Sequence, residues 1–126
     1  MIEAEETFDN WEFLAEYSRQ EAFENGFLID LSSMGREVGL RYPLAITPEV
    51  YYECVMTADD AELGDERERA LDLATQVAGL ARASIAEPVI CFDFVTDSDS
   101  LEVVALKLVC SNGDFGEPVL TVLHNA

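Results

Sequence analysis

Residues 89–123 read VICFDFVTDSDSLEVVALKLVCSNGDFGEPVLTVL, three runs rich in β-branched and aromatic residues with a polar break after each of the first two. Runs of this length and composition are typical of strands, and short breaks that contain Asp, Ser, Asn and Gly are typical of hairpin turns. The stretch therefore predicts a three-stranded antiparallel meander with strands at 89–95, 101–110 and 118–123. Gly113 and Gly116 are interpreted as turn residues.

Alternation along these runs assigns the two faces of the predicted sheet. The face expected to pack against helices carries Ile90, Phe92, Phe94, Leu106, Leu108, Leu120 and Val122. The opposite face carries Asp93, Lys107 and Thr121. A carboxylate beside an ammonium group can do acid–base work, but a cross-strand ion pair of small energetic value is the commoner result of such an arrangement.

Residues 65–84 predict the longest helix of the chain. Its apolar residues Ala70, Leu73, Ala74, Val77 and Ala81 recur at intervals of three and four, and Leu71, Ala78 and Leu80 widen the stripe. A stripe this wide is typical of a helix buried against a sheet.

Shorter elements precede this helix. Ser18 and Glu21 have the spacing of a capping box, and Gly26 ends the helix that they begin. Residues 27–31 then predict a short strand. Ser32 or Ser33 is expected to cap a second short helix.

The second short helix is expected to end at Gly39, and the proline at position 43 makes residues 42–46 extended. Thr47 followed by a proline and an acid predicts a third helix. Its apolar stripe would comprise Tyr51, Cys54, Val55 and Ala58.

The order of these elements, helices first and meander last, predicts an α+β domain in which N-terminal helices pack on the three-stranded antiparallel meander. One or two extra short strands are compatible with it. The 126 residues are sufficient for a single domain with a hydrophobic core. Residues 1–16 predict either a short amphipathic helix or an acidic and aromatic arm that orders on a partner.

The three cysteines, Cys54, Cys91 and Cys110, are an odd number without C-x-x-C spacing. We expect buried thiols in a reducing compartment, and neither a disulfide framework nor a zinc site. No stretch has the length and apolarity of a membrane span, and the N-terminus does not resemble a signal peptide. The expected location is therefore cytoplasmic, and no cofactor is expected.

The clearest functional signal is charge, because 26 acidic residues stand against 7 basic ones and give a formal net charge of −19. Hydrophobic residues make up 49% of the chain, which separates it from acidic disordered tails. An acidic surface repels phosphate backbones and anionic membranes, so direct binding to either is not expected. A soluble surface that binds nothing, or adaptation to high salt, would give the same composition.

The predicted partner-binding residues form three acidic clusters. They are Glu3, Glu5, Glu6, Asp9, Glu12 and Glu16 in the opening; Asp59, Asp60, Glu62, Asp65, Glu66 and Glu68 around a lone Arg67; and Asp97, Asp99 and Glu102 in a hairpin. Carboxylates at phosphate-like spacing can occupy the basic groove of a nucleic-acid-binding protein. The hairpin cluster lacks most ligands of a calcium loop, so no metal is expected.

Among the basic residues, Arg19, Arg36 and Arg41 are expected to bind neighbouring carboxylates or helix C-termini. His124, the single histidine, lies two residues from the end of the chain and is assigned no role.

Several short motifs, taken in order, resemble an uncharacterised family of small acidic proteins carried on plasmids and other mobile elements. They are YSRQEA at 17–22, NG before LIDL at 28–31, REVG at 36–39, YPLAIT at 42–47, LK at 106–107 and GDFGEPVLT at 113–121. The chain departs from the family pattern at Ser111 and Asn112, where a Gly-Pro-type turn is expected. The resemblance implies action against host defence, or a role in maintenance and transfer, and it carries over no catalytic residue.

These observations predict a non-enzymatic inhibitor or decoy whose carboxylates occupy the nucleic-acid site of a basic host protein, such as a restriction or RNA-guided nuclease. A first alternative is a structural or regulatory module that docks on a partner, or on a second copy as a homodimer, through Phe8, Trp11 and Phe13. A second is a small-molecule-binding or enzymatic domain built around Asp93, Lys107 and Thr121.

Overall fold

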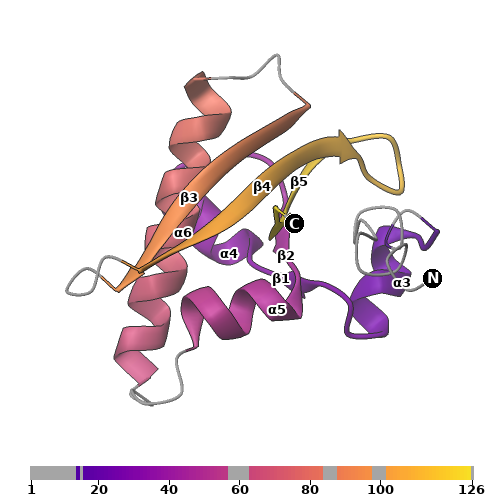
Figure 1. Cartoon of the computed structure of the whole chain (residues 1–126). Coiled ribbons are helices and arrows are strands. Elements are labelled where there is room, and N and C mark those ends of the chain that lie inside the picture. The colour runs from indigo at the N-terminus through magenta and orange to yellow at the C-terminus, as the bar shows by residue number, and fades with distance from the viewer. Residues whose placement is uncertain (1–13, 15, 57–62, 84–87, 98–101, 126) are drawn as a thin grey trace, which may run out of the picture.

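The computed structural model describes residues 14, 16–56, 63–83, 88–97 and 102–125, which form an α+β fold around a five-stranded mixed sheet (Figure 1). The strands are β1 (Ile29–Asp30), β2 (Leu44–Ile46), β3 (Val89–Asp97), β4 (Glu102–Asn112) and β5 (Pro118–His124). The helices are α3 (Arg19–Glu24), α4 (Ser32–Glu37), α5 (Pro48–Val50), the π-helix η1 (Tyr51–Val55) and α6 (Leu63–Ala83).

The predicted meander is confirmed as one part of a larger sheet. β3, β4 and β5 pair antiparallel, and each begins and ends within two residues of its predicted bounds. The prediction did not foresee that the strand order is β1-β2-β5-β4-β3, with β2 parallel to β5. All residues from Val119 to Leu123 are buried, so both edges of β5 need backbone partners, and β2 supplies the second.

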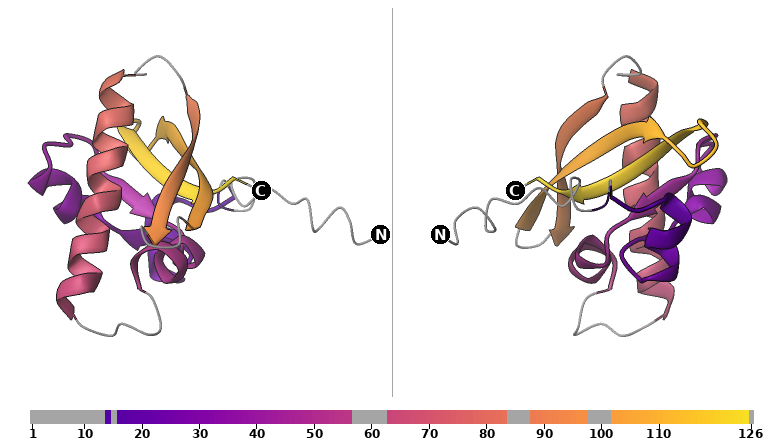
Figure 2. Two further views of the ribbon diagram at one scale, coloured as in Figure 1. Left: turned by 60° about the vertical axis from the view of Figure 1, so that its left-hand side comes forward. Right: turned by 90° about the vertical axis from the view of Figure 1, so that its right-hand side faces the viewer.

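The predicted long helix is also confirmed, and α6 lies along one face of the sheet (Figure 2). Leu73 and Val77 are completely buried, and they pack against the face that carries Phe94, Leu106 and Leu108, as alternation predicted. Burying a side chain of this size contributes roughly 1.5–3 kcal/mol. No helix in the described part of the chain has the length and apolarity to span a bilayer.

The second face of the sheet is covered only in part. Leu14, Ala22 and Leu28 pack there against Val109 of β4 and Leu123 of β5. The remainder of this face, on β3 and β4, is exposed and includes Val89, Val95, Val103 and Cys91.

The expectation of three buried thiols is wrong for two of them, and the incomplete cover of the second face accounts for one of the two. Cys54 is completely buried, whereas Cys91 and Cys110 are exposed. Cys91 lies on the open part of the second face. Cys110 lies on the first face, near the end of β4, where its backbone amide donates to the carbonyl of Pro88.

The helix starts are partly as predicted. Ser18 and Glu21 form the expected capping box of α3, and Gly26 follows it with a positive φ of 79°. The expected serine cap of α4 is wrong, because Leu31 stands at the N-cap without a side-chain bond. The Ser32 hydroxyl instead accepts a hydrogen bond from the amide of Leu44 at 3.0 Å, which ties α4 to β2.

Thr47 caps the third helix as predicted and accepts from the amide of Val50 at 3.3 Å. After three residues, however, the helix widens into η1, where the amide of Met56 donates to the carbonyl of Tyr51 at 2.8 Å. The expected α-helix to position 58 therefore gives way to a π-helix that ends at Val55. One extra residue per turn does not show in a pattern of apolar residues, and π-turns of this kind often mark functional sites.

Candidate functional site

The structure describes part of each predicted acidic cluster. Glu16, Asp65, Glu66, Glu68, Asp97 and Glu102 belong to the described residues. The others, Glu3, Glu5, Glu6, Asp9, Glu12, Asp59, Asp60, Glu62 and Asp99, lie outside them.

The described residues of two of the three clusters lie toward one end of the molecule. Asp65, Glu66 and Glu68 occupy the first turns of α6, and Asp97 pairs with Glu102 where β3 and β4 approach their hairpin. The ribbon views place the end of β3 at Asp97, the start of β4 at Glu102 and the N-terminal end of α6 toward the same end of the molecule (Figures 1 and 2). η1 contacts both β3 and α6 and lies between them.

The first cluster does not join this end. Glu16 is exposed and stands just before α3, which packs on the second face of the sheet, opposite α6. The fold thus separates the described residue of the first cluster from those of the other two.

Two further carboxylates belong with the acidic residues that meet at this end. Glu53 is exposed on η1, which packs beside α6, and Glu49 is exposed on α5, which packs against η1 and β5. The acidic end, as we name it, comprises Glu49, Glu53, Glu66 and Glu68 together with the backbone positions of Asp65, Asp97 and Glu102. The spacing of Glu49 and Glu53 was visible in the sequence, because residues four apart share one side of a helix. It did not indicate which other element that side would face.

Two side-chain bonds fix η1 within the acidic end. The Tyr51 hydroxyl donates to a carboxylate oxygen of Glu66 at 2.5 Å, and this bond, with burial as a lesser cause, raises the pKa of Tyr51 to about 12. The Nε2 atom of His124 lies 2.6 Å from a carboxylate oxygen of Glu53. The first bond joins η1 to α6, and the second joins it to β5.

Arg67, the basic residue within the middle cluster, binds a carboxylate outside the acidic end. Arg67 donates from Nη2 to both carboxylate oxygens of Glu37, at 2.6 and 2.9 Å. Glu37 is the last residue of α4, outside the predicted clusters. Arg67 is therefore paired with a carboxylate that belongs to a neighbouring helix.

The polar trio on the sheet is not assembled as a surface site. Asp93 and Lys107 lie on the predicted face, and the register sets Lys107 opposite Cys91. Thr121 lies on the same face but is completely buried, and its hydroxyl accepts from Nη1 of Arg19 at 2.9 Å. Among the described residues, no group of three or more His, Cys, Asp and Glu side chains is arranged to hold a metal ion.

Arg19 was predicted to bind a carboxylate or a helix C-terminus, but its guanidinium binds β5 instead. Its second guanidinium donor, Nη2, binds the carbonyl of Leu120 at 2.9 Å, and the guanidinium lies over the ring of Phe23 at 5.6 Å from the centroid. Burial lowers the pKa of Arg19, and the nearby Asp30 and Asp114 oppose that effect. The side chain anchors α3 to the sheet.

Comparison of the chain with protein-family models, curated proteins and solved structures finds no match. The resemblance to a mobile-element family therefore stays a prediction.

Proposed function

We propose that this chain is a non-enzymatic binding protein whose acidic end occupies a positively charged surface on a partner protein. The surface we have in mind is one that ordinarily binds nucleic acid, such as the cleft of a host nuclease. The observation that carries the proposal is that the described residues of the middle and hairpin clusters, with Glu49 and Glu53, lie toward one end of the fold.

Charge density supports a nucleic-acid site as the target. Each strand of a duplex carries one phosphate per ~3.4 Å of its axis. Carboxylates three or four residues apart on a helix lie about 5–6 Å from one another. A surface of this kind can replace phosphates in a groove lined by Lys and Arg, and its approach is accelerated by charge complementarity.

The bond between Arg67 and Glu37 further supports a basic partner. Arg67 is bound to Glu37, a carboxylate outside the acidic end, while Arg69 directly follows Glu68 in the sequence. His124 adds at most one positive charge beside Glu53. The net charge of −19 makes a basic partner the favoured class over nucleic acid or an anionic membrane.

The arrangement of Asp93, Lys107 and Thr121 on the sheet supports a function without catalysis. Acid–base chemistry by Asp93, Lys107 and Thr121 would need the three side chains to face one substrate. With the hydroxyl of Thr121 buried and bonded to Arg19, this arrangement is not available.

The experiment is affinity capture from a host lysate at low and high ionic strength. The test variant is E49K/E68K, which changes two exposed carboxylates of the acidic end, and the matched control is E24K/D93K, which makes the same charge change on other elements. We expect a partner that is captured by the wild type and by the control, but weakly by E49K/E68K and weakly at high salt. Equal capture by both variants would contradict the proposal.

A truncation separates this function from docking through the aromatic opening. The deletion should stop before Leu14, because Leu14 is buried in the core. Removal of residues 1–12 is expected to leave charge-dependent capture in place. Loss of capture would contradict binding through the acidic end and would assign it to residues 1–12, either to their carboxylates or to Phe8 and Trp11.

A further inference from the structure

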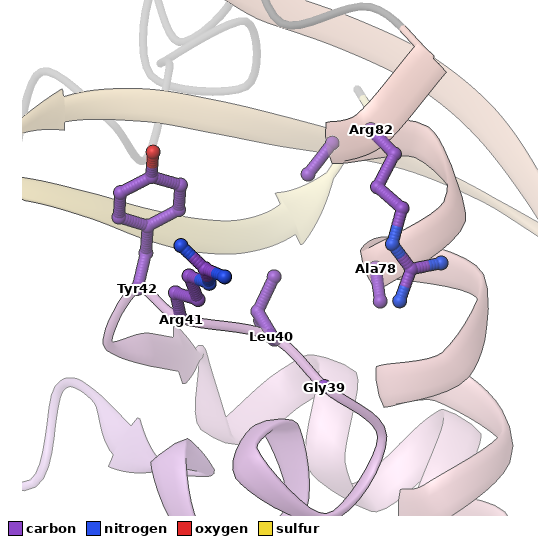
Figure 3. Close-up of a pocket in the computed structure, with 7 residues that line it drawn as sticks. Gly39, Leu40, Arg41, Tyr42, Ala78 and Arg82 are labelled. Carbon is purple, nitrogen blue, oxygen red and sulfur yellow. The ribbon is translucent and has the colours of Figure 1, made fainter.

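A pocket lies between the connection from α4 to β2 and the C-terminal half of α6 (Figure 3). Residues 39–42 form one wall, and Ala78, Ala81 and Arg82 form the other. Its volume is about 190 Å³. Pockets for drug-sized ligands usually have about 300–1,000 Å³, so this one suits a smaller molecule.

The charge of this pocket is opposite to that of the chain. Its lining includes Arg41 and Arg82 and no carboxylate, although acidic residues outnumber basic ones by 26 to 7. Both arginines are exposed. No ion pair is found for Arg41 within the described part of the chain, and its predicted binding to a carboxylate or a helix C-terminus stays a prediction.

Arg82 is held in place by the backbone of the opposite wall. Its Nη2 atom donates to the carbonyl of Val38 at 3.3 Å. Gly39 follows with a positive φ of 90°, and a Cβ atom at this position would lie 3.4 Å from the same nitrogen. One donor of the guanidinium is thus used by the backbone, and the remaining donors stay available at the pocket.

The base of the pocket is apolar. Leu40 and Ala78 are buried, Ala81 is partly buried, and the ring of Tyr42 is 38% exposed. In Figure 3, Leu40 lies between the side chains of Arg41 and Arg82. An apolar surface flanked by two guanidinium groups matches a ligand that combines one anionic group with a short apolar body.

We propose that this pocket binds a small organic anion. A carboxylate or phosphate group would pair with Arg41 and Arg82, and the apolar portion would lie on Leu40, Ala78 and Ala81. Repulsion by distant carboxylates falls off beyond the Debye length of ~8 Å at physiological ionic strength, so the two arginines dominate locally. This site is separate from the acidic end and does not depend on the function proposed for it.

The test is titration of the ¹⁵N-labelled full chain with benzoate, phenyl phosphate and the neutral benzamide, followed by amide chemical shifts. We expect saturable shifts at Gly39, Leu40 and Ala78 with at least one of the two anions and none with benzamide. The anion that binds more tightly identifies the preferred charged group. No saturable shift with either anion, or equal binding of benzamide, would overturn the proposal.

Three variants test whether the anion binds in this pocket. R41Q removes an exposed guanidinium from the lining and is expected to weaken anion binding at least about fivefold. R36Q is the matched control, because Arg36 is exposed on α4 and does not line the pocket. A81L is expected to fill the pocket and to abolish binding while both arginines remain. Unchanged affinity in both R41Q and A81L would also overturn the assignment.

Discussion

The carboxylate of Asp114 accepts a hydrogen bond from the backbone amide of Arg19 at 2.7 Å, across 95 residues of sequence. Its second oxygen accepts from the amide of Gln20 at 3.0 Å. Asp114 lies in the turn between β4 and β5, so this turn binds the start of α3. The guanidinium of Arg19 completes the connection by donating to Thr121 and Leu120 of β5.

Replacing Asp114 with Asn is expected to destabilise the fold in a pH-dependent way. The two backbone bonds lower the pKa of Asp114, so its ionised form stabilises the folded state. That contribution is complete above the unfolded pKa of about 3.9 and is lost as pH falls through the lower folded value. Urea midpoints of wild type and D114N should differ most at neutral pH and converge in acid. A difference that does not change with pH would contradict this role.

The bond between Arg19 and Thr121 can be isolated by a double-mutant cycle. R19M leaves a buried hydroxyl and a carbonyl without their donor, and it is expected to cost about 1–3 kcal/mol of unfolding free energy. T121V removes the acceptor. In the double variant R19M/T121V the losses should not add, and a coupling of about 1 kcal/mol is expected from urea denaturation. Additive losses would show that the two side chains do not interact.

The three cysteines should divide into two classes of reactivity. Cys91 and Cys110 are exposed and are expected to react with Ellman's reagent in the native protein. Cys54 is expected to react only on unfolding, because burial raises the pKa of its thiol to about 12 and excludes the reagent. The fast phase should disappear in C91S/C110S. A fast phase in that variant would mean that Cys54 is accessible and that η1 is not packed as described.

The phenol of Tyr51 should lose its proton at a higher pH than an unfolded tyrosine. Its hydrogen bond to Glu66 raises its pKa to about 12, whereas an unfolded tyrosine has a pKa of about 10. The stabilising contribution is therefore complete below pH 10 and is lost as pH rises toward 12. Phenolate absorbance should show one late transition that is missing in Y51F and moves to lower pH in E66Q. An unshifted transition in E66Q would contradict the bond.

Local signals predicted most elements of the fold. Alternation located β3, β4 and β5, the apolar stripe located α6, and Ser18 and Thr47 identified two helix starts. The pairing of β2 with β5 was not predictable in this way, because it joins segments far apart in sequence and depends on which edge of β5 remains unpaired. Ser32 has the residue type of a cap, but its hydroxyl is used by β2.

The candidate site was predictable in composition and not in arrangement. The described residues of the middle and hairpin clusters lie toward one end because α6 begins at the end of the sheet where β3 ends and β4 begins. Nothing in the residues themselves encodes that proximity. The pocket between Arg41 and Arg82 was missed for the same reason, since its two walls are contributed by segments about forty residues apart.

The most direct test of the central claim is competition between this protein and duplex DNA for the purified partner. If the acidic end occupies the nucleic-acid site, the apparent Kd of the complex should rise in proportion to duplex concentration. E49K/E68K should weaken the complex by at least about tenfold, roughly 1.4 kcal/mol, while E24K/D93K has a smaller effect. A partner that binds the duplex and this protein at the same time, with an unchanged Kd, would contradict the account.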